Sequence, residues 1–143
     1  MRHVYITSLV ALLFATGMSS NRQYTITVHI TGLRSDKGTL YLSLYHSARG
    51  YPRDTSAAFR LSAAPISNSK ATVILEAIPE GVYAMACFHD ENSNRKLDGN
   101  LFGIPTEGTG ASNNARGSWG PPRFRDAAFT LSNDTTLTIK MVY

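Results

Sequence analysis

From residue 24 onward, apolar and polar side chains alternate in short runs, and this period of two constrains the fold more than any other feature. In residues 24–31 every second side chain is apolar, the apolar set being Tyr24, Ile26, Val28 and Ile30. Successive side chains of a β-strand point to opposite faces, so the pattern predicts a strand with one buried face. No segment after residue 20 shows a sustained helical period, which argues against a helical fold.

Six further segments predict short strands bounded by turn residues. They are residues 39–45, 57–61, 71–75, 82–89, 127–131 and 136–142. Residues 82–89 are almost wholly apolar, which predicts a strand buried on both faces. Ser132-Asn133-Asp134 predicts a hairpin turn between the last two strands. About seven short strands predict an all-β fold, an antiparallel β-sandwich of the immunoglobulin-like or transthyretin-like kind.

The residues Ile78-Pro79-Glu80-Gly81-Val82-Tyr83 carry the chemistry of a tight turn before a strand. Proline fixes one turn dihedral and glycine permits a positive one. In sandwiches a tyrosine so placed can bond back to the turn backbone. The pattern resembles that of transthyretin-like and prealbumin-like sandwich domains, and a generic turn before a strand is the alternative. Tyr83 is therefore a candidate for a tyrosine corner.

Residues 1–20 predict a secretory signal peptide. Arg2 and His3 precede an apolar run over residues 4–15, which is too short to span a membrane, and small residues follow. An uncleaved anchor or a buried N-terminal helix is the alternative. We expect export to the periplasm or medium and one sandwich domain over residues 21–143. The single cysteine, Cys87, offers neither a disulfide nor a lipid acceptor at the cleavage site, so no stable membrane anchor is expected after cleavage.

The charge balance is mildly basic, with 14 lysines and arginines against 10 aspartates and glutamates and a net charge of +4. Loss of Arg2 with the leader lowers the net charge to +3. Because export separates the protein from nucleic acid, we expect no nucleic-acid partner. A cell-envelope glycan or a small molecule suits the mild basic excess better.

Directly after the apolar strand, residues 89–100 read HDENSNRKLDGN. Oxygen-bearing residues alternate along this loop, and Ca²⁺ takes 6–8 oxygen ligands. The expected metal set is Asp90, Asn92, Asn94, the backbone carbonyl of Lys96, and Asp98. Arg95 and Leu101 stand where an EF-hand loop has glycine and glutamate, so an EF-hand is rejected and any Ca²⁺ affinity is expected to be weak, about 10⁻⁴–10⁻³ M. A tight turn capped by the same side chains is the alternative.

Residues 101–126 form a long segment rich in glycine and proline, which predicts a loop. Its aromatic residues predict that it packs onto the sandwich, and ordered loops of this length are often functional. A structural crossover is the alternative. Together with the end of the preceding strand, the loop supplies ligand-binding candidates, namely His89, Glu107, Asn113, Asn114, Arg116, Trp119 and Phe124.

Three blocks of the sequence carry a family resemblance. They are His89-Asp90-Glu91-Asn92 with Asn94, Phe102-Gly103-Ile104-Pro105 with Glu107-Gly108, and Ser112-Asn113-Asn114-Ala115-Arg116-Gly117 followed by the 120–129 stretch. With them the chain resembles the domain-of-unknown-function 2141 family, a group of exported bacterial proteins. The resemblance implies export and a β-sandwich and carries no assigned activity. Members of that family often have glycine where Arg95 stands.

No catalytic motif stands out, because a Gly-x-Ser-x-Gly sequence is absent and Cys87 lies within an apolar strand. The sequence therefore favours a non-catalytic module that binds a ligand or an envelope polymer and carries a weak Ca²⁺ loop, with no catalytic residue. A small periplasmic hydrolase or lyase that uses the 101–126 loop is one alternative, with His89, Glu107 and Arg116 as an acid–base cluster. A purely structural envelope protein is the other.

Overall fold

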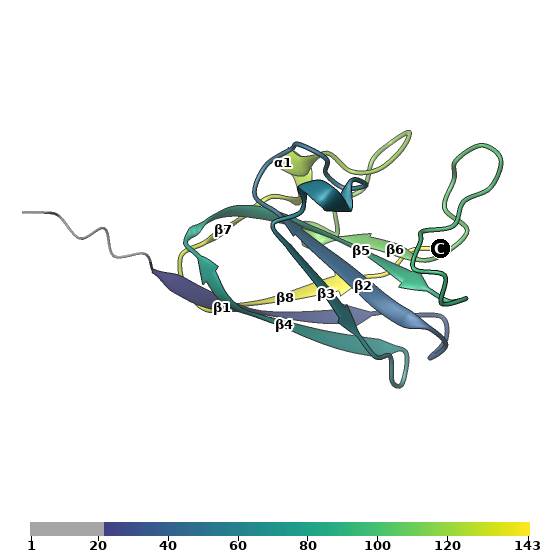
Figure 1. The fold of residues 1–143 in the computed structure, drawn as a ribbon, viewed down its shortest axis with the longest axis horizontal. Coiled ribbons are helices and arrows are strands. Elements are labelled where there is room, and N and C mark those ends of the chain that lie inside the picture. The colour runs from purple at the N-terminus through teal and green to yellow at the C-terminus, as the bar shows by residue number, and fades with distance from the viewer. Residues whose placement is uncertain (1–21) are drawn as a thin grey trace, which may run out of the picture.

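Two β-sheets pack face to face in the computed structural model, which describes residues 22–143 (Figure 1). The expected signal peptide lies outside the described residues. One sheet has the order β4-β1-β8, formed by Lys70–Pro79, Gln23–Thr31 and Thr135–Lys140. The other has the order β3-β2-β5-β6, formed by Arg60–Ala64, Thr39–Tyr45, Gly81–Asp90 and Thr109–Ala111, and β7 (Phe129–Leu131) also pairs with β5. The expected all-β sandwich is confirmed, with eight strands among the described residues.

The period of two places one face of each sheet in the core. Ile26, Val28 and Ile30 of β1 are fully buried. They share one core with buried leucines of β2 and with Tyr83, Met85 and Cys87 of β5. Burial of apolar side chains on this scale is the main stabilising contribution to the fold. The expectation that the 82–89 strand is buried on both faces is correct for the face of Tyr83, Met85, Cys87 and His89 and only partly correct for the other, where Val82 is 50% exposed.

Three expectations about strand boundaries or turns are wrong. The strand predicted over residues 127–131 begins only at Phe129, because residues 124–127 form a helical turn. Residues 57–61 were expected to form one strand, but a 3₁₀ turn, η1 (Thr55–Ala57), precedes β3 because the Asp54 side chain accepts the Ser56 N–H at 3.0 Å and caps it. Residues 132–134 are not a hairpin turn, because β7 pairs with β5 while β8 pairs in parallel with β1. This turn instead carries the chain from one sheet to the other.

The glycine-rich 101–126 segment contains regular structure that its composition does not indicate. It includes β6, a 3₁₀ turn η2 (Ser112–Asn114) and a single helical turn α1 (Phe124–Ala127). Thr109 of β6 exchanges two backbone hydrogen bonds with Val142, at 2.8 and 2.9 Å, which links the two sheets. Gly110 permits this approach, since a Cβ there would meet Ile139 Cγ2 at 2.7 Å. A larger residue would push β6 off the core.

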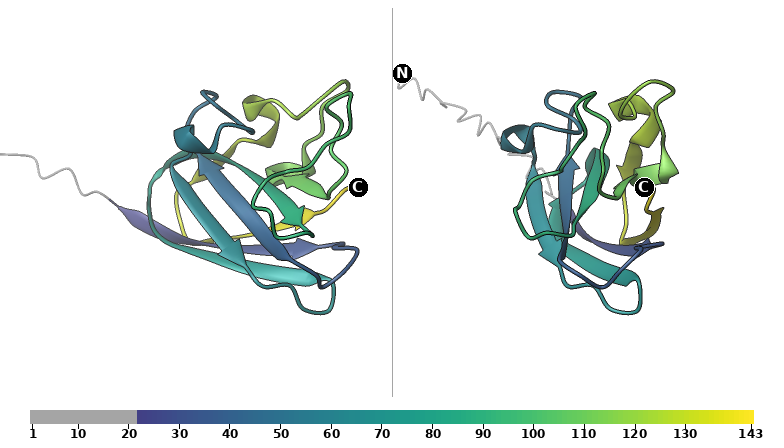
Figure 2. Two further views of the ribbon diagram at one scale, coloured as in Figure 1. Left: turned by 45° about the vertical axis from the view of Figure 1, so that its right-hand side comes forward. Right: turned by 90° about the vertical axis from the view of Figure 1, so that its right-hand side faces the viewer.

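The predicted tyrosine corner is confirmed. The Tyr83 hydroxyl donates to the Pro79 carbonyl at 2.9 Å and ties the start of β5 to the preceding turn. Within residues 22–143, no helix is both long and apolar enough to cross a membrane. The two segments that leave the sheets furthest are residues 91–108 and residues 112–123, and both extend from the same side of the sandwich (Figure 2).

Candidate functional site

The loop of residues 91–108 leaves the end of β5 and is anchored there by a buried carboxylate. Asp90 is fully buried, and its two oxygens accept the backbone N–H groups of Asn94 at 3.1 Å and Arg95 at 2.8 Å. Arg95 has a φ of 63°, in the left-handed region that glycine adopts most easily. The Asp90 carboxylate therefore caps this turn even though position 95 holds an arginine and not a glycine.

The other members of the expected metal set close the same loop through their amides. The side-chain N–H groups of Asn92 and Asn94 donate to the Asp98 carboxylate at 2.6 to 3.0 Å. The amide oxygens of Asn92 and Asn94 accept the backbone N–H groups of Asn94 and Lys96, at 3.1 and 2.8 Å. The side chains of Asp90, Asn92, Asn94 and Asp98 thus form a capped turn at the end of β5, to which Lys96 contributes its backbone N–H.

A second buried carboxylate, that of Glu107, holds together Glu91 and Asp98, the two ends of the 91–98 stretch. Its side chain lies between them, 6% exposed, with one oxygen accepting the Glu91 N–H at 2.9 Å and the other accepting the Asp98 N–H at 3.1 Å. Glu107 was a ligand-binding candidate in the sequence. Both of its oxygens instead bind backbone amides of its own chain.

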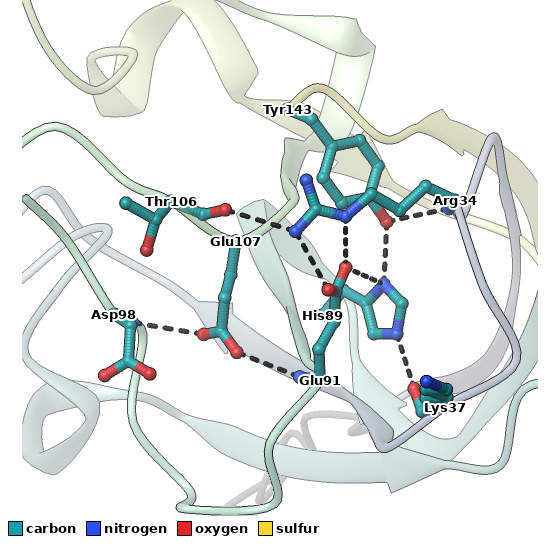
Figure 3. A network of polar contacts seen from close by, with 8 residues as sticks. All are labelled: Arg34, Lys37, His89, Glu91, Asp98, Thr106, Glu107 and Tyr143. Atoms are coloured by element: carbon teal, nitrogen blue, oxygen red, sulfur yellow. Dashed lines mark hydrogen bonds and ion pairs between the residues drawn. The ribbon is translucent and has the colours of Figure 1, made fainter.

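His89 is fully buried at the edge of this loop, and both of its ring nitrogens have partners (Figure 3). Nε2 lies 2.6 Å from the Lys37 carbonyl and Nδ1 lies 2.7 Å from the Tyr143 hydroxyl. A carbonyl only accepts, so a ring protonated at Nε2 donates to Lys37 and accepts the Tyr143 hydroxyl proton at Nδ1. Neither nitrogen is free to accept a proton from a substrate in this arrangement.

Arg34 and Tyr143 complete this network and were not among the sequence candidates. Arg34 forms a two-pronged contact with Glu91, at 2.7 and 2.9 Å, and its guanidinium lies 4.5 Å from the centre of the Tyr143 ring. The hydrogen bond from Arg34 holds the pKa of Glu91 below its ordinary value, and the same contact raises the pKa of Arg34. Burial raises the pKa of Tyr143. No local sequence signal marks this network, because its members come from three distant segments.

The three residues of the hydrolase alternative do not share a pocket. His89 and Glu107 are buried with their polar atoms bonded within the chain, whereas Arg116 lines a separate hollow. The Cys87 thiol is also enclosed, with its sulfur 3.6 Å from that of Met141, and burial raises its pKa to about 12. A thiol in that state is a poor nucleophile.

Two of the remaining candidates bind backbone groups and hold η2 in place. The Asn113 side chain donates to the Ala128 carbonyl at 2.8 Å, and that of Asn114 accepts the Lys140 N–H of β8 at 2.8 Å. Phe124 is half-buried and meets Tyr51 edge to face, with ring centres 5.8 Å apart. These contacts order the segment around β6 and α1.

The expectation that the large apolar and aromatic residues of the 101–126 segment pack onto the sandwich is correct for Phe124 and wrong for Trp119, Phe102 and Ile104. Trp119 is fully exposed, Phe102 is 87% exposed and Ile104 is 59% exposed. Backbone hydrogen bonds and Phe124 suffice to hold the segment, so these side chains are left in solvent.

An open hollow of about 490 Å³ lies on the 116–126 part of the segment. Its lining includes Arg116, Trp119, Arg123, Arg125 and Asp126. Arg125 and Asp126 form an exposed ion pair at 3.4 Å, so Arg116 and Arg123 carry the excess positive charge. The structure thus brings two sequence candidates, Arg116 and Trp119, into one basic, aromatic-bearing surface.

The fold and these features define a small all-β sandwich domain whose loops carry its polar and basic groups. Residues 28–139 match the family described as "Uncharacterized protein conserved in bacteria (DUF2141)", and the chain belongs to this family. The resemblance recognised in the sequence is therefore confirmed. No curated protein and no solved structure shows a significant match to the chain.

The Glu107 contacts predict a large effect of a small substitution. Glu107→Gln replaces one acceptor oxygen with an NH₂ group that faces a backbone N–H, so we expect a loss of about 1–3 kcal/mol in the free energy of unfolding. Urea denaturation measures this loss, with the exposed Glu80→Gln as the matched control. Equal stability of the two variants would show that Glu107 does not clamp the loop.

Proposed function

We propose that this protein is an exported, non-catalytic binding module whose basic hollow takes an anionic envelope polymer, and whose 90–98 loop binds Ca²⁺ weakly. The observation that carries the first part is the lining of the hollow. Arg116 and Arg123 present charge without a carboxylate partner among the described residues, and Trp119 stands fully exposed beside them.

This combination suits an anionic glycan better than a small apolar molecule. Arginine forms paired, charge-assisted hydrogen bonds with carboxylates and phosphates. An aromatic face provides a platform for the apolar face of a sugar ring, much as it does for other flat ligand groups. The hollow is open rather than enclosed, which fits a chain that passes across it. Because the lining is mostly polar and charged, little apolar area is available to a hydrophobic ligand.

Binding at the hollow predicts a fluorescence change, because Trp119 is the single tryptophan of the chain. We expect a uronate polymer such as alginate to alter Trp119 emission and neutral dextran to leave it unchanged. The double variant Arg116→Ser/Arg123→Ser should bind alginate at least about tenfold more weakly, because each lost charge-assisted hydrogen bond contributes roughly 1.5–3 kcal/mol.

Arg60→Ser, on β3, is the matched control for lost charge, and its alginate affinity should equal that of the unsubstituted protein. The proposal for the hollow fails if alginate leaves the emission unchanged. It also fails if the double variant and the Arg60 variant bind alginate equally well.

The Ca²⁺ part of the proposal is supported by the convergence of two carboxylates and two amides in one loop. Asp98 already gathers the side chains of Asn92 and Asn94, and Asp90 lies at the start of the same loop. To offer oxygens to a cation, these amides have to rotate and give up the backbone N–H groups that their oxygens now accept. This cost, together with the neighbouring charges of Arg95 and Lys96, limits the affinity to the weak range of extracellular modules.

Calcium binding to the folded state predicts a rise in melting temperature. For a Kd of about 1 mM, 10 mM Ca²⁺ adds about 1.4 kcal/mol of stability, which raises the Tm of a domain of this size by about 5 °C. Asp98→Asn should remove the rise, whereas Asp126→Asn, outside the loop, should preserve it. An unchanged Tm of the unsubstituted protein in 10 mM Ca²⁺, with Mg²⁺ as the ionic-strength control, would refute the calcium loop.

A further inference from the structure

The tip of the 91–108 loop displays large apolar side chains directly to solvent. In the segment of residues 99–105, which we call the finger, Leu101 is fully exposed, Phe102 is 87% exposed and Ile104 is 59% exposed. Single exposed apolar residues are common on protein surfaces, but a contiguous group at a projecting tip indicates an interaction site.

The finger is an ordered turn rather than a loose excursion. The Gly103 N–H donates to the Asn100 carbonyl at 2.9 Å, which closes a β-turn with Leu101 and Phe102 at its two central positions. The Asn100 side-chain oxygen also accepts the N–H groups of Phe102 at 2.9 Å and Ile104 at 3.1 Å.

At its base the finger is closed by the bridge between Gly99 and Pro105 and by the Asn100 N–H, which donates to the Ile104 carbonyl at 2.8 Å. Four backbone N–H groups of the finger, those of Asn100, Phe102, Gly103 and Ile104, thus have acceptors within the finger itself, whereas the Leu101 N–H has none among the described residues. A tip with most of its amides satisfied enters a low-dielectric medium at a lower cost than one with free amides.

Cationic and aromatic side chains lie on the same side of the sandwich as the finger. The same loop carries exposed Arg95 and Lys96, while its three acids, Glu91, Asp98 and Glu107, are each bonded within the chain. The 112–123 segment also extends from this side of the sandwich and carries exposed Arg116 and fully exposed Trp119 (Figures 1 and 2). Positive charge attracts anionic lipid headgroups, and tryptophan favours the boundary between headgroups and acyl chains.

We infer that the finger inserts Leu101 and Phe102 into the interface of an anionic lipid bilayer, while the surrounding cations contact the headgroups. A convex tip with three apolar side chains fits this occupant better than it fits a protein. Stable protein interfaces cover about 800 Å² per partner with complementary shape, whereas a fluid bilayer accommodates a tip of any shape. The binding is peripheral and reversible, and so differs from a membrane anchor.

Vesicle co-sedimentation tests this inference on the chain without its signal peptide. We expect binding to vesicles of phosphatidylglycerol mixed with phosphatidylcholine, and at least about tenfold weaker binding to phosphatidylcholine alone or to the variant Leu101→Ser/Phe102→Ser. Trp119 emission should shift to shorter wavelength on the anionic vesicles. The double variant removes only exposed side chains, so its Tm should match that of the unsubstituted protein.

The matched control is Ile74→Ser/Val82→Ser, which removes two exposed apolar side chains, 59% and 50% exposed, from strands. Its binding to anionic vesicles should be unchanged. The inference is overturned if the unsubstituted protein ignores anionic vesicles or if the finger variant binds them equally well. It is also overturned if sedimentation shows self-association that the finger variant abolishes, since the tip would then bind a second copy. Because the finger residues lie outside the hollow, failure with alginate and failure with vesicles are separate results.

Discussion

Burial of two carboxylates, Asp90 and Glu107, is the constraint on which the loop region of this protein depends. Each accepts two backbone N–H groups of the 91–98 stretch, so four amides that would otherwise need water are satisfied from the core side. Charge-assisted hydrogen bonds of this kind contribute more than neutral ones. They allow a loop with several left-handed residues, including Arg95 with a φ of 63°, to keep one conformation against the end of β5.

The sandwich below provides the rigid support for this arrangement. β5 is the central strand of its sheet, and its last residues carry both His89 and Asp90 into the interior. Tyr143 and Arg34 reach the same place from other segments and enclose His89. The polar groups nearest the core therefore form hydrogen bonds that hold the loops in place. The groups that remain exposed to solvent are on the outer parts of those loops, in the basic hollow and at the apolar finger. This division is the basis of the binding role proposed for the protein.

The sequence predicts the features that depend on local pattern and misses those that depend on pairing between distant segments. Alternation identified β1 and β2 because each has a full row of apolar side chains facing the core. The three residues of β6 are too few to show a period, and the parallel pairing of β8 with β1 has no local signal. The Asx turns of the 90–98 loop could be anticipated from spacing. The clamp by Glu107 and the pair of Arg34 with Glu91 could not, since 57 residues separate the members of that pair.

Amide hydrogen exchange of the unsubstituted protein tests most directly whether buried carboxylates hold the loop. The account predicts slow exchange, comparable to that of the strand amides, at Glu91 and Arg95, whose N–H groups donate to Glu107 and Asp90 at 2.9 and 2.8 Å. Asp98 should be protected as well. Exchange of these amides at the rate of an unstructured chain would contradict the account, because the loop would then open freely and present neither the hollow nor the finger in a fixed position.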